Sequence, residues 1–211
     1  MFEDRRDAGE RLAKALKKYK NRKVLVLGIP RGGVEVAYHV AKYLDAEFSM
    51  LVARKLPYPY NPEAGFGAIA EDNSIFMFKN AERELSKKEI EKIIEEQKQE
   101  VKRRVERLRK GKPLPEISGR EVILIDDGLA MGSTMRTAIM LCKNRKAERI
   151  VVAVPVSGRD IARDIGEMVD EIVVLEKPLF FYAVAQVYNN WYDVSDEEVL
   201  EIMKKAEEIF K

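Results

Sequence analysis

Residues 122–134 read Val-Ile-Leu-Ile-Asp-Asp-Gly-Leu-Ala-Met-Gly-Ser-Thr, and this stretch carries the clearest structural signal in the chain. Its four apolar residues end in two adjacent carboxylates, Asp126 and Asp127. A short turn rich in small and hydroxyl residues follows, and a helical pattern begins at Thr134. Because a continuous apolar run is typical of a buried parallel strand, the stretch predicts a strand, a loop and the start of a helix.

The predicted loop carries groups that suit a phosphate monoester. The backbone N–H groups of residues 130–134 and the Ser133 and Thr134 hydroxyls would lie at a helix N-terminus, where free donors and the helix dipole favour an anion. Asp126 and Asp127 suit sugar hydroxyls and Mg²⁺, a cation that prefers oxygen ligands. Together these groups predict a site for a ribose 5-phosphate that carries a diphosphate. The alternative is a plain strand–turn–helix whose acidic pair has no role, although adjacent carboxylates repel each other.

The spacing of this stretch resembles the motif with which type I phosphoribosyltransferases bind 5-phosphoribosyl 1-diphosphate (PRPP). It is not a Walker A loop, because no Lys follows Gly132. The resemblance implies that Asp126 and Asp127 are catalytic residues that hold the ribose hydroxyls and, directly or through water, Mg²⁺. It also implies a substrate-binding loop made of Gly128, Leu129, Ala130, Met131, Gly132, Ser133 and Thr134.

Two further segments supply cations for the diphosphate. Arg31-Gly32-Gly33 follows the first predicted strand, and its glycines permit a close backbone approach while Arg31 offers a bidentate fork for an oxyanion. This segment resembles the family's pyrophosphate loop, although it also fits an ordinary tight turn. Arg54-Lys55 closes the second predicted strand, where the family places a basic residue, and the alternative is a solvated pair. Residues 61–67 lie where the family has a mobile loop.

The resemblance extends to one group of phosphoribosyltransferases with an uncharacterised acceptor, whose members are also found fused to hydrolase domains. It covers almost the whole chain and rests on residues 2–9, 30–34, 52–56, 61–63, 126–130 and 194–198.

Alternating strand and helix patterns predict an α/β fold: a Rossmann-like parallel sheet of the type I phosphoribosyltransferase kind, with helices on both faces. We expect a single domain over residues 1–211, into which residues 56–118 insert a loop, a hairpin and a long helix. The loop covers 56–64 and the hairpin flanks 71–74. The helix covers 86–110 and starts with the capping box of Ser86 and Glu89. Further strands are expected at 24–27, 48–53, 150–156 and 171–175, and further helices at 4–20, 34–44, 134–145, 159–168 and 197–210.

Composition excludes several classes of protein. The 38 basic and 36 acidic residues nearly balance, which argues against a nucleic-acid partner. A single cysteine, Cys142, excludes an internal disulfide, and the chain shows no signal peptide and no apolar run of about 20 residues, so we expect a cytoplasmic protein without a membrane partner. A homodimer is the assembly expected by default.

One position departs from the family pattern. Ala130 stands where purine-type members often carry an Asp that serves as general base, and a methyl group cannot take a proton. His39, the single histidine, lies within a helical pattern that favours packing over catalysis. Aromatic residues from the C-terminal region stack on the nucleobase in the family, so Phe180, Phe181 or Trp191 are candidates to contact an acceptor, against a plain core role.

These patterns predict a Mg²⁺-dependent transferase that moves 5-phosphoribosyl from PRPP to a nitrogen acceptor of the nucleobase kind, with release of pyrophosphate. The alternative that Ala130 supports is a catalytically silent sensor of PRPP or a nucleotide. A third interpretation is a partner-binding module built on the helix at 86–110.

Overall fold

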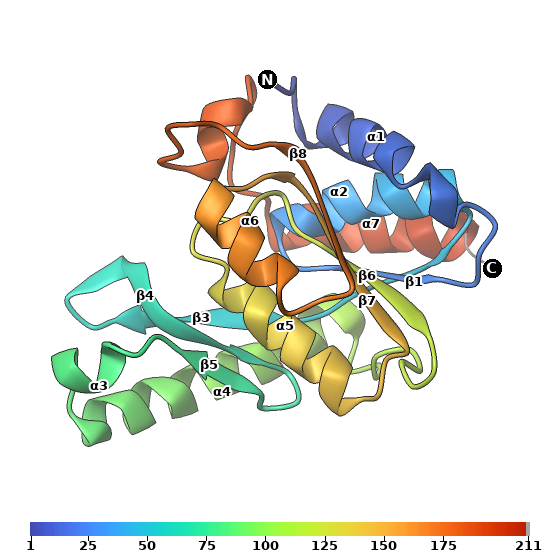
Figure 1. The fold of residues 1–211 in the computed structure, drawn as a ribbon. Coiled ribbons are helices and arrows are strands. Elements are labelled where there is room, and N and C mark those ends of the chain that lie inside the picture. The colour runs from blue at the N-terminus through green and yellow to red at the C-terminus, as the bar shows by residue number, and fades with distance from the viewer. Residues whose placement is uncertain (210–211) are drawn as a thin grey trace.

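A computed structural model describes residues 1–209, and its centre is a parallel sheet of five strands in the order β2-β1-β6-β7-β8 (Figure 1). The strands are β1 (Leu25–Gly28), β2 (Glu47–Met50), β6 (Glu121–Ile125), β7 (Arg149–Val156) and β8 (Glu171–Glu176). Every residue of β1 is buried, as expected for a strand covered on both faces. The α/β fold class predicted from the alternating patterns is confirmed.

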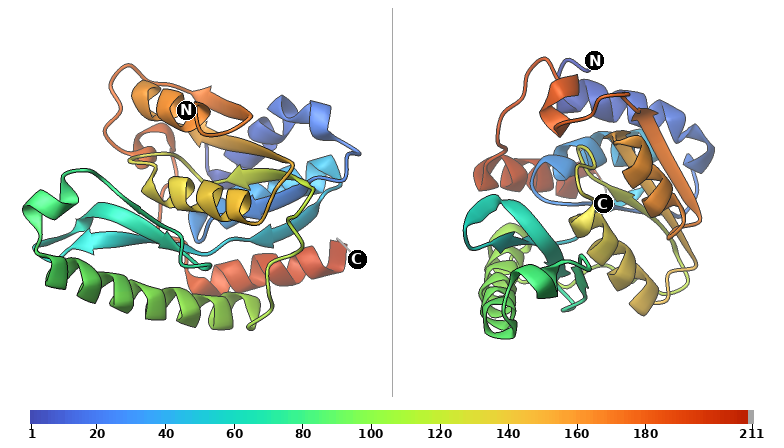
Figure 2. Two further views of the ribbon diagram at one scale, coloured as in Figure 1. Left: turned by 60° about the horizontal axis from the view of Figure 1, so that its bottom comes forward. Right: turned by 60° about the vertical axis from the view of Figure 1, so that its left-hand side comes forward.

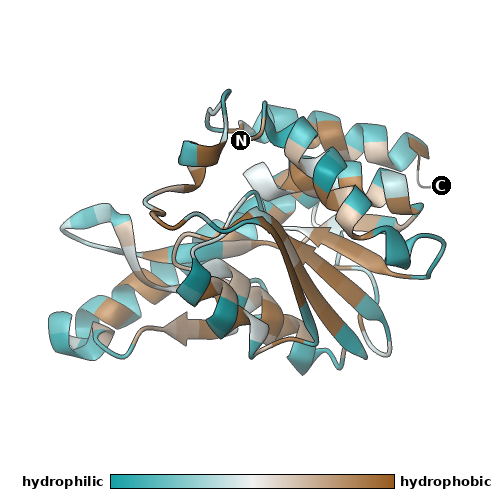
Figure 3. Cartoon of the chain, turned by 45° about the horizontal axis from the view of Figure 1, so that its top comes forward, coloured by the Kyte–Doolittle hydropathy of each residue, from teal (hydrophilic) through white to brown (hydrophobic). Residues whose placement is uncertain are grey.

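Helices cover both faces of this sheet (Figures 1 and 2). One apolar cluster joins the sheet to α1 (Arg5–Ala15), α2 (Gly32–Leu44) and α7 (Asp196–Ile209). A second cluster joins the opposite face to α5 (Ser133–Asn144) and α6 (Arg159–Gly166). The strands between these layers are the most hydrophobic part of the ribbon in Figure 3. Two short 3-10 helices, at Lys17–Tyr19 and Val184–Val187, complete the connections.

Beside the main sheet lies a smaller antiparallel sheet made of β3 (Ala53–Tyr58), β4 (Asn61–Ala70) and β5 (Ile75–Met77). The hairpin predicted around residues 71–74 is confirmed as β4–β5. The loop predicted at 56–64 is wrong, because β3 and β4 pair across it as a second hairpin. Pro57 is accommodated by register shifts on both of its sides, which is how an antiparallel ladder tolerates a proline.

The strand predicted at 48–53 is two strands in two sheets. β2 ends at Met50, and β3 starts at Ala53 and turns into the antiparallel sheet. The apolar run is continuous because the connection, Leu51 and Val52, is as buried as the strands that it joins. Arg54-Lys55 therefore lies inside a strand and not at a strand end.

The long helix predicted at 86–110 is confirmed as α4 (Lys87–Arg109), preceded by the short α3 (Ala81–Glu84). The Ser86 side chain accepts from the Glu89 N–H, and the Glu89 carboxylate accepts from the Ser86 N–H at 2.8 Å, so both halves of the capping box form. At the other end, the buried Arg109 guanidinium pairs with the Glu71 carboxylate, with Nη1 to Oε1 at 2.8 Å. This ion pair ties α4 to the β4–β5 hairpin.

The closing helix predicted at 197–210 is α7, and Ser195 caps it as expected, since its hydroxyl accepts from the Glu198 N–H at 3.2 Å. Phe210 lies outside the described residues. The single-domain organisation, with residues 56–118 as an insertion, stays a prediction. No helix within residues 1–209 is long and apolar enough to cross a membrane.

Candidate functional site

The predicted binding segments meet where the order of the sheet reverses. The chain runs from β1 outward to β2 and returns to β6 on the other side of β1, so β1 and β6 are parallel neighbours with loops at the same edge. Ligands of open α/β sheets bind at such a switch point, beyond the carboxyl ends of the strands. Arg31-Gly32-Gly33 follows β1, and Asp126-Asp127 follows β6, so the topology brings these two predicted segments together.

The two glycines of the β1 loop pack directly on the acidic pair. A Cβ placed on Gly32 would overlap the Asp127 carboxylate, and it would lie 2.7 Å from the Arg5 Nε atom. A Cβ on Gly33 would lie 2.8 Å from the Asp126 Cα atom. The sequence needs glycine at both positions because any side chain would occupy the space of the carboxylates.

The two carboxyl groups of the acidic pair share one cationic partner within the described residues. Asp127 forms an ion pair with Arg5, with Oδ2 2.9 Å from Nε, and the Arg5 side chain is only 3% exposed. The Oδ1 atom of Asp126 accepts from the backbone N–H of Asp127 at 2.8 Å. Burial and the charge of Asp127 raise the pKa of Asp126 well above its ordinary value, and burial also raises the pKa of Asp127 against the opposing effect of Arg5.

The loop after the pair has free donors. Gly132 adopts a left-handed conformation with φ of 72° and precedes α5, which starts at Ser133, one residue before the predicted start. Leu129 donates to the Val156 carbonyl at 2.9 Å, which fixes the start of the loop on β7. Within the described chain, the N–H groups of residues 130–134 donate to no other protein group. Backbone donors without partners at a helix N-terminus favour an anion.

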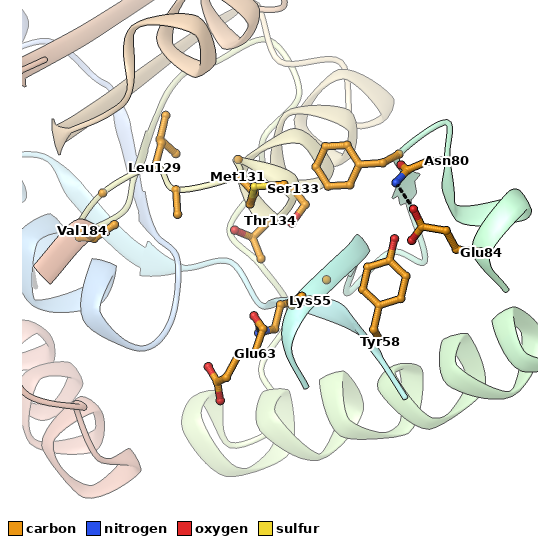
Figure 4. Close-up of a pocket in the computed structure, with 16 residues that line it drawn as sticks. Lys55, Tyr58, Glu63, Asn80, Glu84, Leu129, Met131, Ser133, Thr134 and Val184 are labelled. Carbon is orange, nitrogen blue, oxygen red and sulfur yellow. Dashed lines mark hydrogen bonds between the residues drawn. The ribbon is translucent and has the colours of Figure 1, made fainter. Parts of the chain in front are cut away.

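These donors line a cavity of about 620 Å³ between the loop and the smaller sheet (Figure 4). Lys55 of β3 and Thr134 of α5 converge on the same space, with Leu129 and Val184 at one side. Tyr58 and Glu84 form the opposite wall, where the Tyr58 hydroxyl bonds to the Glu84 carboxylate and this bond raises the pKa of Tyr58 to about 12. Every predicted loop residue from Gly128 to Thr134 lines the cavity, whereas Asp126 and Asp127 precede this loop and are not among the lining residues.

Arg54 and Lys55, the two cations predicted to bind the diphosphate, both lie on β3 and point to opposite faces of it. Lys55 lines the cavity and donates to the Glu63 carbonyl at 2.5 Å. Arg54 faces α4, where its Nε lies 3.4 Å from the Gln97 Oε1 atom. Burial lowers the pKa of Arg54, and the nearby cations Arg104 and Arg31 lower it further. Arg31 lies 3.7 Å from the Asp196 Oδ1 atom, at the start of α7.

Residues from the two ends of the chain complete the site, and sequence patterns did not single out two of them, Arg5 and Tyr188, for a role. The Tyr188 hydroxyl donates to the Asp127 carbonyl at 2.7 Å. The Arg5 guanidinium stacks on the Trp191 ring, 4.1 Å from its centroid. Arg5 and Tyr188 are separated from Asp127 by 122 and 61 residues, so no local spacing could reveal these contacts. The one available signal was the position of Arg5 within residues 2–9, one of the segments that carry the family resemblance.

The remaining candidates fall in different places. Phe180 is 73% exposed, whereas Phe181 packs on the cluster formed by Phe2 and Tyr188. The role of these aromatic residues toward an acceptor stays a prediction. His39 packs on α1, since a Cβ on Gly9 would lie 2.9 Å from the His39 Cβ atom. Burial lowers the pKa of His39, in agreement with the packing role expected from its helical pattern.

The family profile of the phosphoribosyl transferase domain matches residues 3–188. The match covers the switch point, both glycines, the acidic pair and the loop at residues 128–134. The chain therefore belongs to the phosphoribosyl transferase family.

Individual relatives agree with this assignment. Proteins from two strains of Mycobacterium tuberculosis, provisionally named as phosphoribosyl transferases, are 39% identical to this chain over its whole length. The alignment covers 48% of each of them, so the chain spans about half the length of these curated relatives. TT1426 from Thermus thermophilus, whose crystal structure is known, is 36% identical in sequence to this chain. The two structures superpose with a TM-score of 0.80, and the match covers 97% of this chain and 98% of TT1426.

Proposed function

We propose that this chain transfers 5-phosphoribosyl from PRPP to a nitrogen acceptor of the nucleobase kind and releases pyrophosphate. One observation carries the proposal: within the described chain, five successive N–H groups without protein partners, at residues 130–134, follow shortly after an acidic pair that has one cationic partner, Arg5. The N–H donors suit the 5-phosphate, and the carboxylate oxygens, which accept hydrogen bonds, suit ribose hydroxyls and a divalent cation.

The donor set fits Mg²⁺. Among residues 1–209, no cluster of three or more acidic, histidine or cysteine side chains could enclose a metal ion without other ligands. Mg²⁺ is usually held by one or two carboxylates together with substrate oxygens and water, which is what Asp126 and Asp127 with a bound diphosphate would provide. When bound, the ion would stabilise the negative charge of the departing pyrophosphate.

Cations of the chain would hold the diphosphate. Lys55 shares the cavity with the loop at residues 128–134, whereas Arg31 and Arg54 lie near each other on the side of α4. In the proposed reaction the bond from ribose C1 to the diphosphate oxygen breaks with its electron pair leaving on the oxygen, a nitrogen lone pair forms the new bond to C1, and the proton of that nitrogen passes to water or to the released pyrophosphate. The residues contribute by positioning the two reactants and by stabilising charge on the leaving group.

The test measures binding and turnover separately. Calorimetry with PRPP and Mg²⁺ should detect one site per chain, and pyrophosphate release should appear with at least one acceptor from a panel of nucleobases. Asp126→Asn and Asp127→Asn should each weaken PRPP binding by about 10- to 100-fold, as expected when hydrogen bonds to a charged group are lost. Asp160→Asn is the matched control, because the Asp160 side chain is 82% exposed on α6.

A second candidate function is a sensor that binds PRPP or a nucleotide without transferring it. Ala130 favours this alternative, because its methyl group lines the cavity at the position where a base is expected. PRPP binding without pyrophosphate release for any acceptor would select the sensor. Unchanged PRPP binding in both Asp→Asn variants would exclude the proposed site for either function.

We also propose that the protein is cytoplasmic and forms a homodimer. Cys142 is buried as a free thiol in the core, which fits a reducing compartment.

A further inference from the structure

We propose that Arg5 is a positioning residue for the ribose-binding carboxylate of Asp127, a role that rests on the proposed function. Arg5 is the first residue of α1, far in sequence from the motif, and its guanidinium is buried at the switch point. Among the described residues it is the one cation that forms an ion pair with the acidic pair.

Two of the three nitrogens of the Arg5 guanidinium donate hydrogen bonds within the site. Its Nε donates to Asp127 Oδ2 at 2.9 Å, and its Nη1 donates to the Tyr192 carbonyl at 2.9 Å. The plane of the guanidinium stacks on Trp191, and Tyr192 lies on it more distantly, with 5.6 Å to the ring centroid. A guanidinium held by two hydrogen bonds and a stacked ring has a fixed orientation, so it fixes the carboxylate that it contacts.

The terminal segments are fastened together so that Arg5 reaches the site. Phe2 donates to the Val187 carbonyl at 2.7 Å, and Asn189 donates back to the Phe2 carbonyl at 2.8 Å. The Asn190 amide donates to the Glu3 carboxylate at 2.7 Å. This short ladder positions the start of α1 against the aromatic segment, immediately before Arg5.

Asp127 is thus held by hydrogen bonds to both its side chain and its backbone carbonyl. Arg5 takes one carboxylate oxygen, the Tyr188 hydroxyl binds the backbone carbonyl, and Gly32 leaves the space in which the Asp127 carboxylate and the Arg5 Nε meet. Within the described chain, Arg5 contacts the Asp127 carboxylate through Oδ2. Arg5 therefore fixes the orientation of this carboxylate, and it acts on PRPP through Asp127 rather than by touching it.

A double-mutant cycle tests this role. Arg5→Met should weaken the binding of PRPP with Mg²⁺ by about 10- to 100-fold in the parent. In an Asp127→Asn background, the same change should alter binding by no more than about twofold, because its route to the ligand is already lost. Arg5→Lys keeps the charge but cannot make both hydrogen bonds. Its affinity for PRPP should therefore lie between that of the parent and that of Arg5→Met. Arg6→Met is the control, since the neighbouring Arg6 is 70% exposed and pairs with Glu10.

The outcomes separate this inference from the proposed function. Equal losses from Arg5→Met in both backgrounds, or no loss in the parent, would overturn the positioning role. If the parent itself does not bind PRPP, the proposed function fails. The urea denaturation midpoints of the parent, the two single variants and the double variant then test whether Arg5 and Asp127 are coupled. Non-additive midpoint shifts would support the coupling of Arg5 to Asp127, and additive shifts would overturn it.

Discussion

The two walls of the proposed PRPP site are built in different ways. The acidic wall, which comprises Gly32, Gly33, Asp126 and Asp127, is packed without spare room and is held by Arg5. The cavity wall, which comprises Lys55, Tyr58, Glu63 and Glu84, belongs to the smaller sheet and its following helix and faces an open space of about 620 Å³. The difference suggests that the carboxylates that would bind the ribose are preformed. The cavity wall, where Lys55 would hold the diphosphate, has room to adapt to its ligand.

The largest effect that we expect concerns how the cavity wall is attached. Arg109 is 5% exposed, and its guanidinium binds Glu71, the Met50 carbonyl and the Lys112 carbonyl. Arg109→Met leaves the Glu71 carboxylate buried without its cation, and it should lower the free energy of unfolding by about 3 kcal/mol or more. Urea denaturation measures this change. Arg103→Met, at a site 54% exposed, should change it by less than about 0.5 kcal/mol.

Equal effects of these two arginine variants would show that the smaller sheet does not depend on this ion pair for its attachment. The cavity wall would then be held mainly by its apolar contacts with α4 and α5.

The next effect tests how tightly the acidic wall is packed. Gly32→Ala adds a Cβ in the space of the Asp127 carboxylate and the Arg5 Nε, so the pair must separate. We expect PRPP to bind about 100-fold more weakly, which is a loss of about 2.7 kcal/mol. Gly158→Ala is the control, because its added Cβ would meet only the partly buried Phe181 ring, at 3.3 Å, which a small shift of the ring relieves, and its nearest neighbours include no atom of the acidic pair. Calorimetry that shows the same affinity in Gly32→Ala and the parent would contradict preformed carboxylates in the acidic wall.

A smaller effect is expected at the open wall. Lys55→Gln removes the one cation among the described residues that line the cavity, and PRPP should bind about tenfold more weakly, or about 1.4 kcal/mol. Lys87→Gln is the control, since Lys87 is 89% exposed at the start of α4. If Lys55→Gln weakened PRPP binding more than Gly32→Ala does, the contacts of the cavity wall with the diphosphate would contribute more to affinity than the acidic wall.

The same contrast separates what the sequence could predict from what it could not. The strand, loop and helix at 122–134 were predictable because their signals are local: an apolar run, two carboxylates and a glycine before the helix. The meeting of Arg31-Gly32-Gly33 with the acidic pair was also predictable, since parallel strands present their carboxyl ends at one edge. In both cases the chemistry and the topology depend on short stretches.

The cavity wall was harder to predict because its signals conflict. Three prolines between residues 57 and 62 indicate a loop, yet β3 and β4 pair there through register shifts that depend on the partner strand. Arg54 and Lys55 were expected to act together, but the alternation of a strand sends them to opposite faces. The contact of Arg5 with Asp127 spans 122 residues and leaves no pattern along the chain.

A crystal structure of the protein with ribose 5-phosphate would show directly whether the loop and the acidic pair bind one sugar phosphate together. We predict that the phosphate accepts from the N–H groups of residues 130–134, and that the 2- and 3-hydroxyls of the ribose donate to Asp126 and Asp127 while Arg5 keeps its contact with Asp127. A sugar phosphate bound elsewhere, or bound in this cavity without contact to the acidic pair, would contradict the account.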